Sequence, residues 1–392
     1  MPDIRDRIKD SILGLERWVE AHDYKGYEPF DGLSSVFRPL TFGNLLLDRL
    51  LLQLVRQSPW NLRPVIGVKP LDSTIGRGYM AWGYCMMFKL TGDHGYMEKI
   101  DRCLQWLIEN KSPGYGEYSW GKHFDFASRG GLYGAFEPIL VWTALIAQAF
   151  LEAYEIFGEE RYLNVADSAC RWIMGLPRNR TETGFCMGYH YQDFESDIHN
   201  SNMVGAAVLA RTAKHTKNSE YLEVAKEAMT YSCTRQLPDG AWWYGEDPTN
   251  HWIDNFHTGY NLDALKCYIE YSGDRDYEGV LRTGLEFYKR HFFEDSGRPK
   301  YYHNRTYPVD SQCASQAMDT LANASEYDGS SLQLGLKVAE WTIGNMRDRE
   351  GFFYYRQYPL GIRAKTHMLH WAQATTYKGL VSLLKGAVKD QK

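Results

Sequence analysis

The chain has 392 residues and a formal net charge of −5, from 44 basic and 49 acidic residues. No basic block is longer than a few residues, which argues against a nucleic-acid-binding protein, and there is no run of about 18 apolar residues to predict a membrane span. Aromatic residues make up 15% of the chain, including 28 Tyr and 12 Trp. Because these two side chains join an apolar face to a hydrogen-bonding tip, their abundance favours a surface that holds sugars or other amphipathic ligands.

The N-terminal segment and the cysteines indicate a cytoplasmic protein. Residues 1–7 are mostly polar and lack the apolar stretch of a signal peptide. The seven cysteines are scattered, odd in number and without the CxxC or Cys/His spacing of a zinc site, so we expect reduced thiols. Phosphate-loop, GxGxxG and GxSxG motifs are absent from the sequence. We therefore expect neither a metal nor a cofactor.

A helix–turn–helix unit recurs along the chain. Its turns precede Tyr96, Tyr162, Tyr221 and Tyr277, which follow one another at intervals of 66, 59 and 56 residues. A fifth turn, at 327–329, lies where the next one is due. Before each turn the helical pattern is low in charge, and after it the pattern is amphipathic. This alternation predicts a buried helix followed by one with an exposed face.

These patterns predict an inner and an outer ring of helices. The low-charge helices are expected at 78–90, 138–156, 200–215, 257–271, 311–324 and 367–386. The amphipathic helices are expected at 94–110, 160–175, 219–234, 275–291 and 331–346, and an apolar stripe in 3–22 supplies the sixth. The predicted fold is all-α: a single (α/α)6 toroid domain over 1–392, with the N-terminal helix closing the ring against the C-terminal helix. An open superhelix of hairpins is the structural alternative.

The connections from each outer helix to the next inner helix are long, and a ring places all of them at one end. They span 23–77, 111–137, 176–199, 235–256, 292–310 and 347–366, and they hold many aromatic residues interleaved with carboxylates, His and Arg. Long loops in a compact domain commonly carry function. Aromatic rings stack on the C–H faces of a sugar while polar groups bind its hydroxyls. We expect a pocket here, with about half of these aromatics only filling the middle of the ring.

The densest candidate segment is 252–260. Asp254 is placed to cap the following inner helix and also to act as an acid or base. His257, in the first turn, is a candidate proton carrier, and Tyr260 lies three residues further on. Asp310 begins the next inner helix in the same way, so Asp254 and Asp310 would form a carboxylate pair if both point inward. Capping alone is the alternative role for both.

Other residues are expected to bind the substrate. Arg129 is placed to clamp a substrate carboxylate, and Asp125 either joins the site or pairs with Arg129. Asn202 is expected to point into the ring and bind a sugar hydroxyl. The remaining predicted substrate contacts are Trp120, Trp243 and Trp252 as stacking surfaces, together with His199, Tyr307 and Trp371.

Five segments carry a resemblance to known proteins: WGKHFDFASR (120–129), HNSN (199–202), DGAWWYGE (239–246), IDNFHTGYNLDAL (253–265) and YPVDSQCASQA (307–317). With them, residues from roughly 60 to 385 look like VpsJ-type polysaccharide-biosynthesis proteins. The helical-hairpin periodicity resembles more widely the six-hairpin glycosidase superfamily, which includes unsaturated glucuronyl hydrolases and N-acylglucosamine 2-epimerases. The resemblance implies the toroid fold and a glycan context.

The leading hypothesis is a carbohydrate-active enzyme of glycoside hydrolase type, acting on a saccharide that contains uronic acid. In it Asp254 and Asp310 share the acid and base work, and His257 and Tyr260 assist. The second hypothesis is a uronate C5-epimerase or lyase that relies on His257, Tyr260 and Arg129. The third is a non-catalytic glycan-binding or scaffold protein in exopolysaccharide biosynthesis. In each case the expected partner is an oligosaccharide or polysaccharide.

Overall fold

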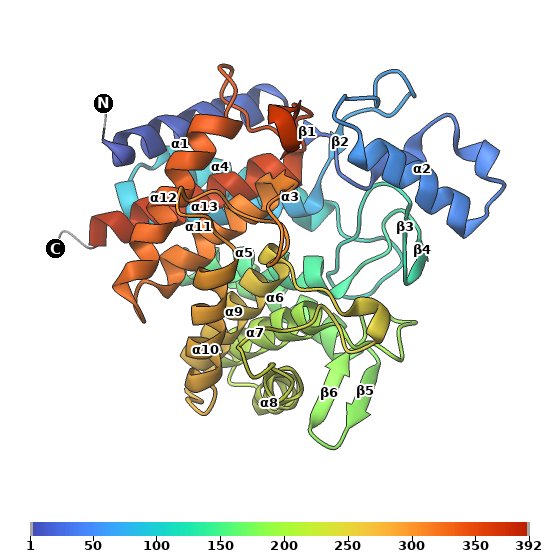
Figure 1. Ribbon diagram of the computed structural model, residues 1–392. Coiled ribbons are helices and arrows are strands. Elements are labelled where there is room, and N and C mark those ends of the chain that lie inside the picture. The colour runs from blue at the N-terminus through green and yellow to red at the C-terminus, as the bar shows by residue number, and fades with distance from the viewer. Residues whose placement is uncertain (1–2, 390–392) are drawn as a thin grey trace.

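A closed ring of six helices forms the centre of the molecule in the computed structural model, which describes residues 3–389 (Figure 1). Each inner helix packs against the next, and the last packs against the first, so the ring closes. The predicted (α/α)6 toroid is therefore confirmed. The inner helices are α3 (Thr74–Thr91), α5 (Leu140–Phe157), α7 (His199–Thr216), α9 (Asn255–Ser272), α11 (Ser311–Ala324) and α13 (Thr375–Lys389), the last preceded by a π-helical segment, Leu369–Ala374.

Six further helices form the outer ring, and all of them except α1 follow an inner helix through a short turn. Helix α1 packs against α13 and α12, so the two ends of the chain meet at this point of the ring. The bounds agree closely with those predicted, because charge pattern and turn residues are local signals. The outer helices are α1 (Ile4–Ala21), α4 (Gly95–Glu109), α6 (Glu160–Met174), α8 (Ser219–Cys233), α10 (Glu278–His291) and α12 (Gly329–Met346).

The inner helices have well-defined ends. Side chains of Ser73, Asp254 and Asp310 accept hydrogen bonds from backbone N–H groups in the first turns of α3, α9 and α11, which would otherwise lack a partner. A glycine in the left-handed conformation ends α3, α5 and α9. These caps place the N-termini of the inner helices at the end of the ring where the long connections lie.

Four of the long connections pack against the outer ring through a glycine at positive φ. A Cβ atom at these positions would lie 2.2–2.7 Å from a backbone oxygen of the next outer helix. Gly184 faces α8, Gly240 faces α10, Gly297 faces α12 and Gly351 faces α1. This repeated contact, which the sequence analysis did not predict, links neighbouring outer helices around the ring.

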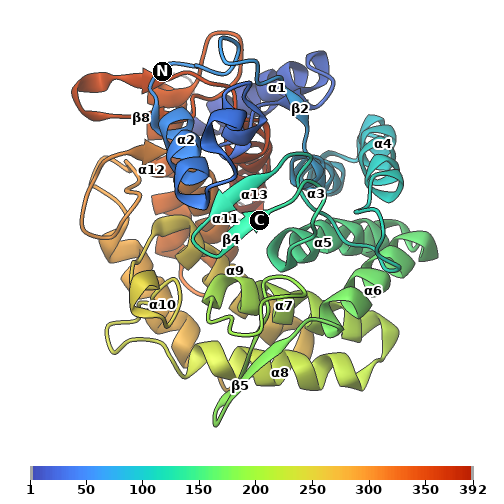
Figure 2. The same cartoon turned by 90° about the vertical axis from the view of Figure 1, so that its right-hand side faces the viewer.

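The connections also form small sheets at the loop end. Strands β3 (Phe126–Ser128) and β4 (Gly131–Tyr133) make a hairpin with Phe126 opposite Tyr133. In the view of Figure 2 this hairpin lies across the mouth of the ring, beside helix α2 (Leu45–Gln57). The other strands are β1 (Lys25–Gly26) paired with β2 (Leu71–Asp72), β5 (Arg178–Thr181) paired with β6 (Gly184–Met187), and the three-stranded set β7 (Val309–Asp310), β8 (Arg356–Gln357) and β9 (Arg363–Ala364).

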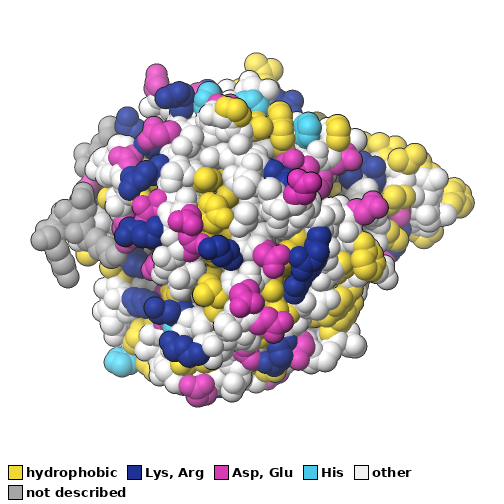
Figure 3. Space-filling view, turned by 90° about the horizontal axis from the view of Figure 1, so that it is seen from below, with side chains coloured by type: hydrophobic (Ala, Val, Ile, Leu, Met, Phe, Trp, Pro, Cys, Tyr) yellow, Lys and Arg dark blue, Asp and Glu magenta, His cyan; other side chains and the backbone are white. Residues whose placement is uncertain are grey.

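Helix α2 was not predicted, because the sequence analysis treated 23–77 as one long connection between α1 and the first inner helix. Asp48, Leu52 and Val55 turn toward the body of the protein and are buried. The opposite side carries exposed leucines, among them Leu46 and Leu50. The segment projects from the ring, as Figures 1 and 3 show.

The cysteines and the most apolar helix complete the description. All seven cysteines are free thiols, as predicted, and all but Cys267 are buried. Within residues 3–389, α5 is the helix whose length and composition would allow it to cross a membrane, and most of its length is buried inside the protein.

Candidate active site

Asp254 and His257 form a tight pair at the start of α9. One oxygen of Asp254, Oδ1, accepts from the backbone N–H of His257 at 3.0 Å. The other, Oδ2, lies 2.7 Å from His257 Nδ1 and accepts from Trp252 Nε1 at 3.0 Å. The carboxylate is only 3% exposed. Its partners hold it in place, and it holds the imidazole ring of His257.

This pairing sets the tautomer of His257 that a general base requires. An ionised carboxylate can only accept, so Nδ1 of His257 carries the proton and Nε2 of the neutral ring keeps its lone pair. Rings of Tyr244 and Phe256 lie 4.6 and 3.9 Å from the imidazole, centroid to centroid. The side chain remains 21% exposed. The arrangement can therefore move a proton at Nε2 while Asp254 stabilises the imidazolium that forms.

A second histidine and carboxylate, His370 and Glu28, meet across the ring. Glu28 Oε2 lies 3.3 Å from His370 Nδ1, and both side chains are 6% exposed. Burial alone would raise the pKa of Glu28, but the charges of His370 and Lys122 outweigh burial and hold that pKa below its usual value. Because 342 residues separate the two partners, no local pattern in the sequence marks this pair.

Two tyrosines lie between the histidines. The hydroxyl oxygens of Tyr79 and Tyr260 are 3.1 Å apart, and Gln312 Nε2 donates to Tyr260 at 2.8 Å. The ring of His370 stacks on Tyr79 at 5.9 Å, and the ring of His257 lies 6.4 Å from Tyr260. Burial raises the pKa of both tyrosines above the usual value, so they act as hydroxyl donors and acceptors at neutral pH.

Lys122 is a further ionisable residue that the sequence analysis passed over. Its ammonium nitrogen lies 4.2 Å from the ring centre of Phe30 and 4.5 Å from those of Phe126 and Trp142. Burial lowers the pKa of Lys122 to about 7, although the nearby charge of Glu28 raises it. The signal was present in the sequence, because Lys122 is a lone cation within an aromatic-rich segment.

The space beside His257 is small in this structure. The cavity lined by Asp254, His257 and Trp252 has a volume of about 10 Å³, which is room for one water molecule. The Oδ1 atoms of Asn200 and Asn261, also in its lining, are buried without a protein partner among the described residues, as expected at a water site. The β3–β4 hairpin covers this end of the ring (Figure 2).

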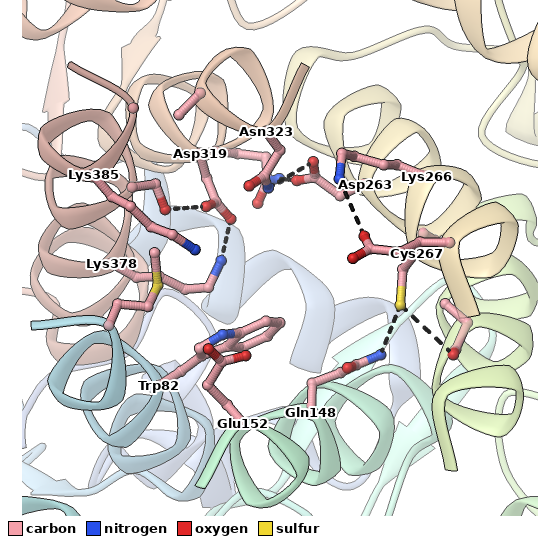
Figure 4. A pocket seen from close by; sticks show the side chains of 18 of the residues that line it. Trp82, Gln148, Glu152, Asp263, Lys266, Cys267, Asp319, Asn323, Lys378 and Lys385 are labelled. Carbon is pink, nitrogen blue, oxygen red and sulfur yellow. Dashed lines mark hydrogen bonds and ion pairs between the residues drawn. The ribbon is translucent and has the colours of Figure 1, made fainter. Parts of the chain in front are cut away.

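A much larger cavity, of about 580 Å³, lies at the other end of the ring. It is lined by the C-terminal halves of the inner helices, with side chains from all six pointing into it (Figure 4). Asp319 forms an ion pair with Lys378, and Asp263 accepts from Gln316 Nε2 at 2.6 Å. The sequence analysis expected a pocket only at the loop end. The sequence analysis missed this cavity because its charged lining residues lie singly on different helices and form no local motif.

No protein-family model matches the chain, and no curated protein is similar to it in sequence. Solved structures are similar in fold. Cellobiose 2-epimerase from Bacillus thermoamylovorans is 12% identical with a TM-score of 0.64, over 80% of this chain and 88% of that one. A possible GH105 family member from Salmonella enterica is 13% identical with a TM-score of 0.65, over 99% and 96%. An unsaturated glucuronyl hydrolase specific for heparin is 11% identical with a TM-score of 0.62, over 99% and 97%.

The chain has the six-hairpin glycosidase fold. At these identities the likeness establishes the fold alone. The resemblance to VpsJ-type proteins stays a prediction. Within residues 3–389 of this six-hairpin toroid, no three His, Cys, Asp or Glu side chains are grouped so as to hold a metal ion.

Asp310, the second residue of the expected carboxylate pair, is held by partners of its own. Asp310 is fully buried and accepts from Arg356 Nε at 2.5 Å and from Trp371 Nε1 at 2.7 Å. It also caps α11 through the backbone N–H of Gln312. Arg356 thus already neutralises the charge of Asp310, and an acid or base role shared with Asp254 stays a prediction. The same contacts hold Trp371, a predicted substrate contact, in the core, where it is 7% exposed.

Three other predicted substrate contacts are buried inside the six-hairpin scaffold. Trp120 is 0% exposed and donates from Nε1 to the backbone oxygen of Leu107. His199 is held by Glu246 at 2.8 Å. Asn202 points away from the ring axis, toward α8 and β6, where its amide donates to the backbone oxygen of Ala228. None of the three presents a surface to a ligand in this structure.

The remaining predicted contacts lie at the surface of the loop end. Asp125 pairs with Arg38 at 2.5 Å and not with Arg129, so that alternative is wrong. Arg129, in the β3–β4 turn, lies over the ring of Trp252 at 5.1 Å and donates to the backbone oxygen of Thr249. Arg129 and Trp252 thus flank the segment that holds His257. Trp243 stacks on His251 beside them, and Tyr307 lies apart, near Arg298.

Proposed function

We propose that this protein is a carbohydrate-active enzyme in which His257, oriented by Asp254, transfers a proton to or from the substrate. The observation that carries the proposal is the 2.7 Å contact between Asp254 Oδ2 and His257 Nδ1, which leaves Nε2 as the base. Aromatic side chains that suit a sugar, among them Trp252 and Tyr244, lie beside it. Support also comes from the fold, which is shared with cellobiose 2-epimerase, D-mannose isomerase and glucuronyl hydrolase structures.

The pair suits epimerisation or isomerisation of a sugar next to its carbonyl group. His257 Nε2 takes the proton as the C–H bond breaks, and the electron pair of that bond forms an enediolate. A proton then returns to the opposite face of the same carbon or to the neighbouring carbon. His370, held by Glu28 beyond the tyrosine pair, is the candidate for the second proton-transfer group. Asp254 stays ionised throughout and stabilises the imidazolium form of His257.

Hydrolysis is the second candidate, favoured by the water-sized cavity beside His257. In that reaction Nε2 would remove a proton from the bound water as it attacks the sugar. A uronic acid substrate fits either reaction, because Arg129 at the mouth can bind a carboxylate through two parallel hydrogen bonds. The preference for uronic acid rests on Arg129 alone.

The test is turnover of mono-, di- and uronic-acid oligosaccharides in deuterated water by the wild type and by His257→Gln. Deuterium uptake without cleavage indicates epimerisation or isomerisation, new reducing ends indicate hydrolysis, and an ultraviolet-absorbing product indicates elimination. We expect His257→Gln and Asp254→Asn each to lower kcat by about 10²–10⁴-fold. His94→Gln, an exposed histidine in the α3–α4 turn, is the control. Full activity in His257→Gln would refute the proposal, and absence of any turnover would favour the non-catalytic alternative.

A further inference from the structure

The 580 Å³ cavity at the short-turn end is not used by the proposed reaction. Tyr79 and Tyr260 line its inner end and separate it from the segment that holds His257. Its volume lies within the range of roughly 300–1,000 Å³ that small-molecule sites occupy, and far exceeds that of a single metal ion. The cavity is therefore large enough for one or two sugar rings.

The charges that line this cavity are unevenly matched. Six carboxylates and five cationic side chains are found among its described lining residues. Lys89 and Arg211 bind Glu152, and Lys378 binds Asp319. Lys266 pairs with both Glu270 and Glu326. With all six carboxylates and all five cationic side chains ionised, the lining has a net charge of −1.

Asp263 is the lining carboxylate that forms no ion pair with a cation among the described residues. Its hydrogen-bond donors are neutral: Gln316 Nε2 at 2.6 Å, Thr320 Oγ1 at 2.9 Å and Asn323 Nδ2 at 3.1 Å. Burial and the neighbouring charge of Asp319 on α11 raise the pKa of Asp263 to about 7, and Lys378 on α13 opposes them. A carboxylate in these surroundings therefore holds a proton more readily than an exposed one, unless a cation lies beside it.

We propose that this cavity binds a small hydroxylated ammonium compound, such as an amino sugar, whose ammonium group forms an ion pair with Asp263. The bound cation replaces the proton and neutralises the cavity. Side-chain amides of Gln148, Gln316 and Asn323 line the cavity and can bind hydroxyl groups. Trp82 also lines it, with the ammonium nitrogen of Lys378 4.1 Å from its ring centre (Figure 4). The ligand is recognised by its single positive charge together with its hydroxyls.

The test is calorimetric titration of the whole protein with D-glucosamine and, as the uncharged match, D-glucose. At about pH 6.5 we expect glucosamine to bind at least about 10-fold more tightly than glucose and to release up to one proton, seen as a dependence of the heat on buffer. Asp263→Asn should remove both effects, whereas the exposed Asp239→Asn should keep them. His257→Gln should bind as the wild type does, which separates this site from the proposed active site. Equal binding of the two sugars, or unchanged binding by Asp263→Asn, would overturn the proposal.

A second, independent observation concerns the projecting segment 36–65, here called the α2 surface. Phe42, Leu46 and Trp60 are 87%, 70% and 74% exposed. Apolar side chains gather on the projection at the right of Figure 3. A patch of this kind is unusual for a surface that stays in water. Its other exposed members are Val36, Phe37, Leu40, Leu45, Leu47, Leu50, Leu54, Leu62 and Val65.

The charge of this region differs from that of the whole chain, which is −5. Five basic residues lie between 32 and 71, and the one carboxylate there is Asp48. Arg63 is buried in an ion pair with Asp31 and Arg38 pairs with Asp125, whereas Lys69 is exposed and Arg49 partly exposed. Asp48 is 1% exposed and accepts from Thr41 Oγ1 at 2.6 Å. The α2 surface therefore presents apolar and cationic groups but no exposed carboxylate.

We infer that the α2 surface docks on an anionic lipid membrane, with α2 lying in the plane of the interface. Leucine, phenylalanine and tryptophan bury in the boundary between headgroups and acyl chains, and Arg49 and Lys69 meet the negative surface. Because α2 lies beside the loop end of the ring (Figure 2), docking would place that end close to the membrane.

The test is flotation with vesicles of phosphatidylcholine alone or with phosphatidylglycerol added. We expect the wild type to float with the anionic vesicles and Leu46→Gln/Leu50→Gln/Leu54→Gln to lose at least about 10-fold in bound fraction. Arg49→Glu/Lys69→Glu should lose binding in a salt-dependent way. Leu132→Gln, at another exposed leucine, is the control. Equal flotation of all variants would overturn the inference, as would a stable dimer in light scattering that the triple variant converts to monomer.

Discussion

At the residue scale, Asp254 and Asp310 stand at the same position of successive inner helices and have different surroundings. Asp254 holds His257, which lies three residues away on the same helix. Asp310 holds Arg356 and Trp371, which are 46 and 61 residues away. The sequence indicated the caps correctly, but only the fold shows that the charge of Asp310 is already neutralised.

Asp310→Asn should destabilise the protein by about 3–5 kcal/mol, because Arg356 would be left as a buried cation without its counter-charge. Denaturant unfolding measures this loss. The control is Asp10→Asn, which removes the exposed partner of Arg347 and should cost at most about 1 kcal/mol. Similar losses in the two variants would show that Asp310 and Arg356 contribute no more than a surface pair.

Lys122 should make the stability of the protein depend on pH. The pKa of Lys122 is about 7 when folded, against an ordinary value of 10.5, so between these values the unfolded chain binds a proton there that the folded chain does not. The free energy of unfolding therefore rises with pH in this window, by up to about 1.4 kcal/mol per pH unit. Unfolding in urea at about pH 7.5 and 9.5 tests this.

Lys122→Met should lose that pH dependence while keeping the packing of the aromatic rings around it. Lys214→Met, at an exposed lysine, should keep it. A wild-type protein whose stability does not increase between the two pH values would show that Lys122 stays charged when folded, held by the ring faces of Phe30 and Trp142.

At the element scale, the glycines of the long connections set the spacing of the outer helices. Gly240, with φ of 96°, brings its connection against the backbone oxygen of Thr283 in α10. Gly184, Gly297 and Gly351 repeat the contact on the next outer helix in each case. The repeated turn glycines were present in the sequence, but their role depends on helices about 40 or more residues away and was not predicted.

Gly240→Ala should destabilise the protein by about 3 kcal/mol, because the new Cβ would lie 2.4 Å from Thr283 O in addition to the cost of positive φ. Gly273→Ala is the matched control. Its φ is also positive, at 75°, but no atom lies within 4 Å of the new Cβ, so about 1–2 kcal/mol is expected. Equal melting temperatures for the two variants would argue against the role of the glycine contacts.

At the scale of the whole molecule, α1 packs against α13 and α12 and closes the outer ring. The start of α1 and the end of α13 lie at the same side of the molecule in Figure 1. The ring of helices is thus closed in space, although the chain begins at α1 and ends at α13. The gap between these two ends corresponds to one of the six inner-to-outer connections around the ring.

A circular permutant that joins the ends through a flexible linker and opens the α7–α8 turn, at Lys217, should therefore fold. We expect wild-type helicity by circular dichroism and a single unfolding transition, because every contact between helices is kept. A permutant opened inside α5, after Ala147, should not fold, since it divides a buried helix. Failure of the first permutant would show that the chain order, and not ring closure, is needed for folding.

The sequence by itself determined the rings of helices, the end of the ring where the long loops lie, and the caps that Asp254 and Asp310 form on their helices. These follow from local patterns: charge periodicity, turn residues and the reach of a capping side chain. Only the tertiary structure decided that Arg356 neutralises Asp310, that Glu28 meets His370, and that the large cavity opens at the short-turn end. Those outcomes depend on side chains brought together from distant parts of the chain, and the volume left between packed helices is not encoded in any single segment.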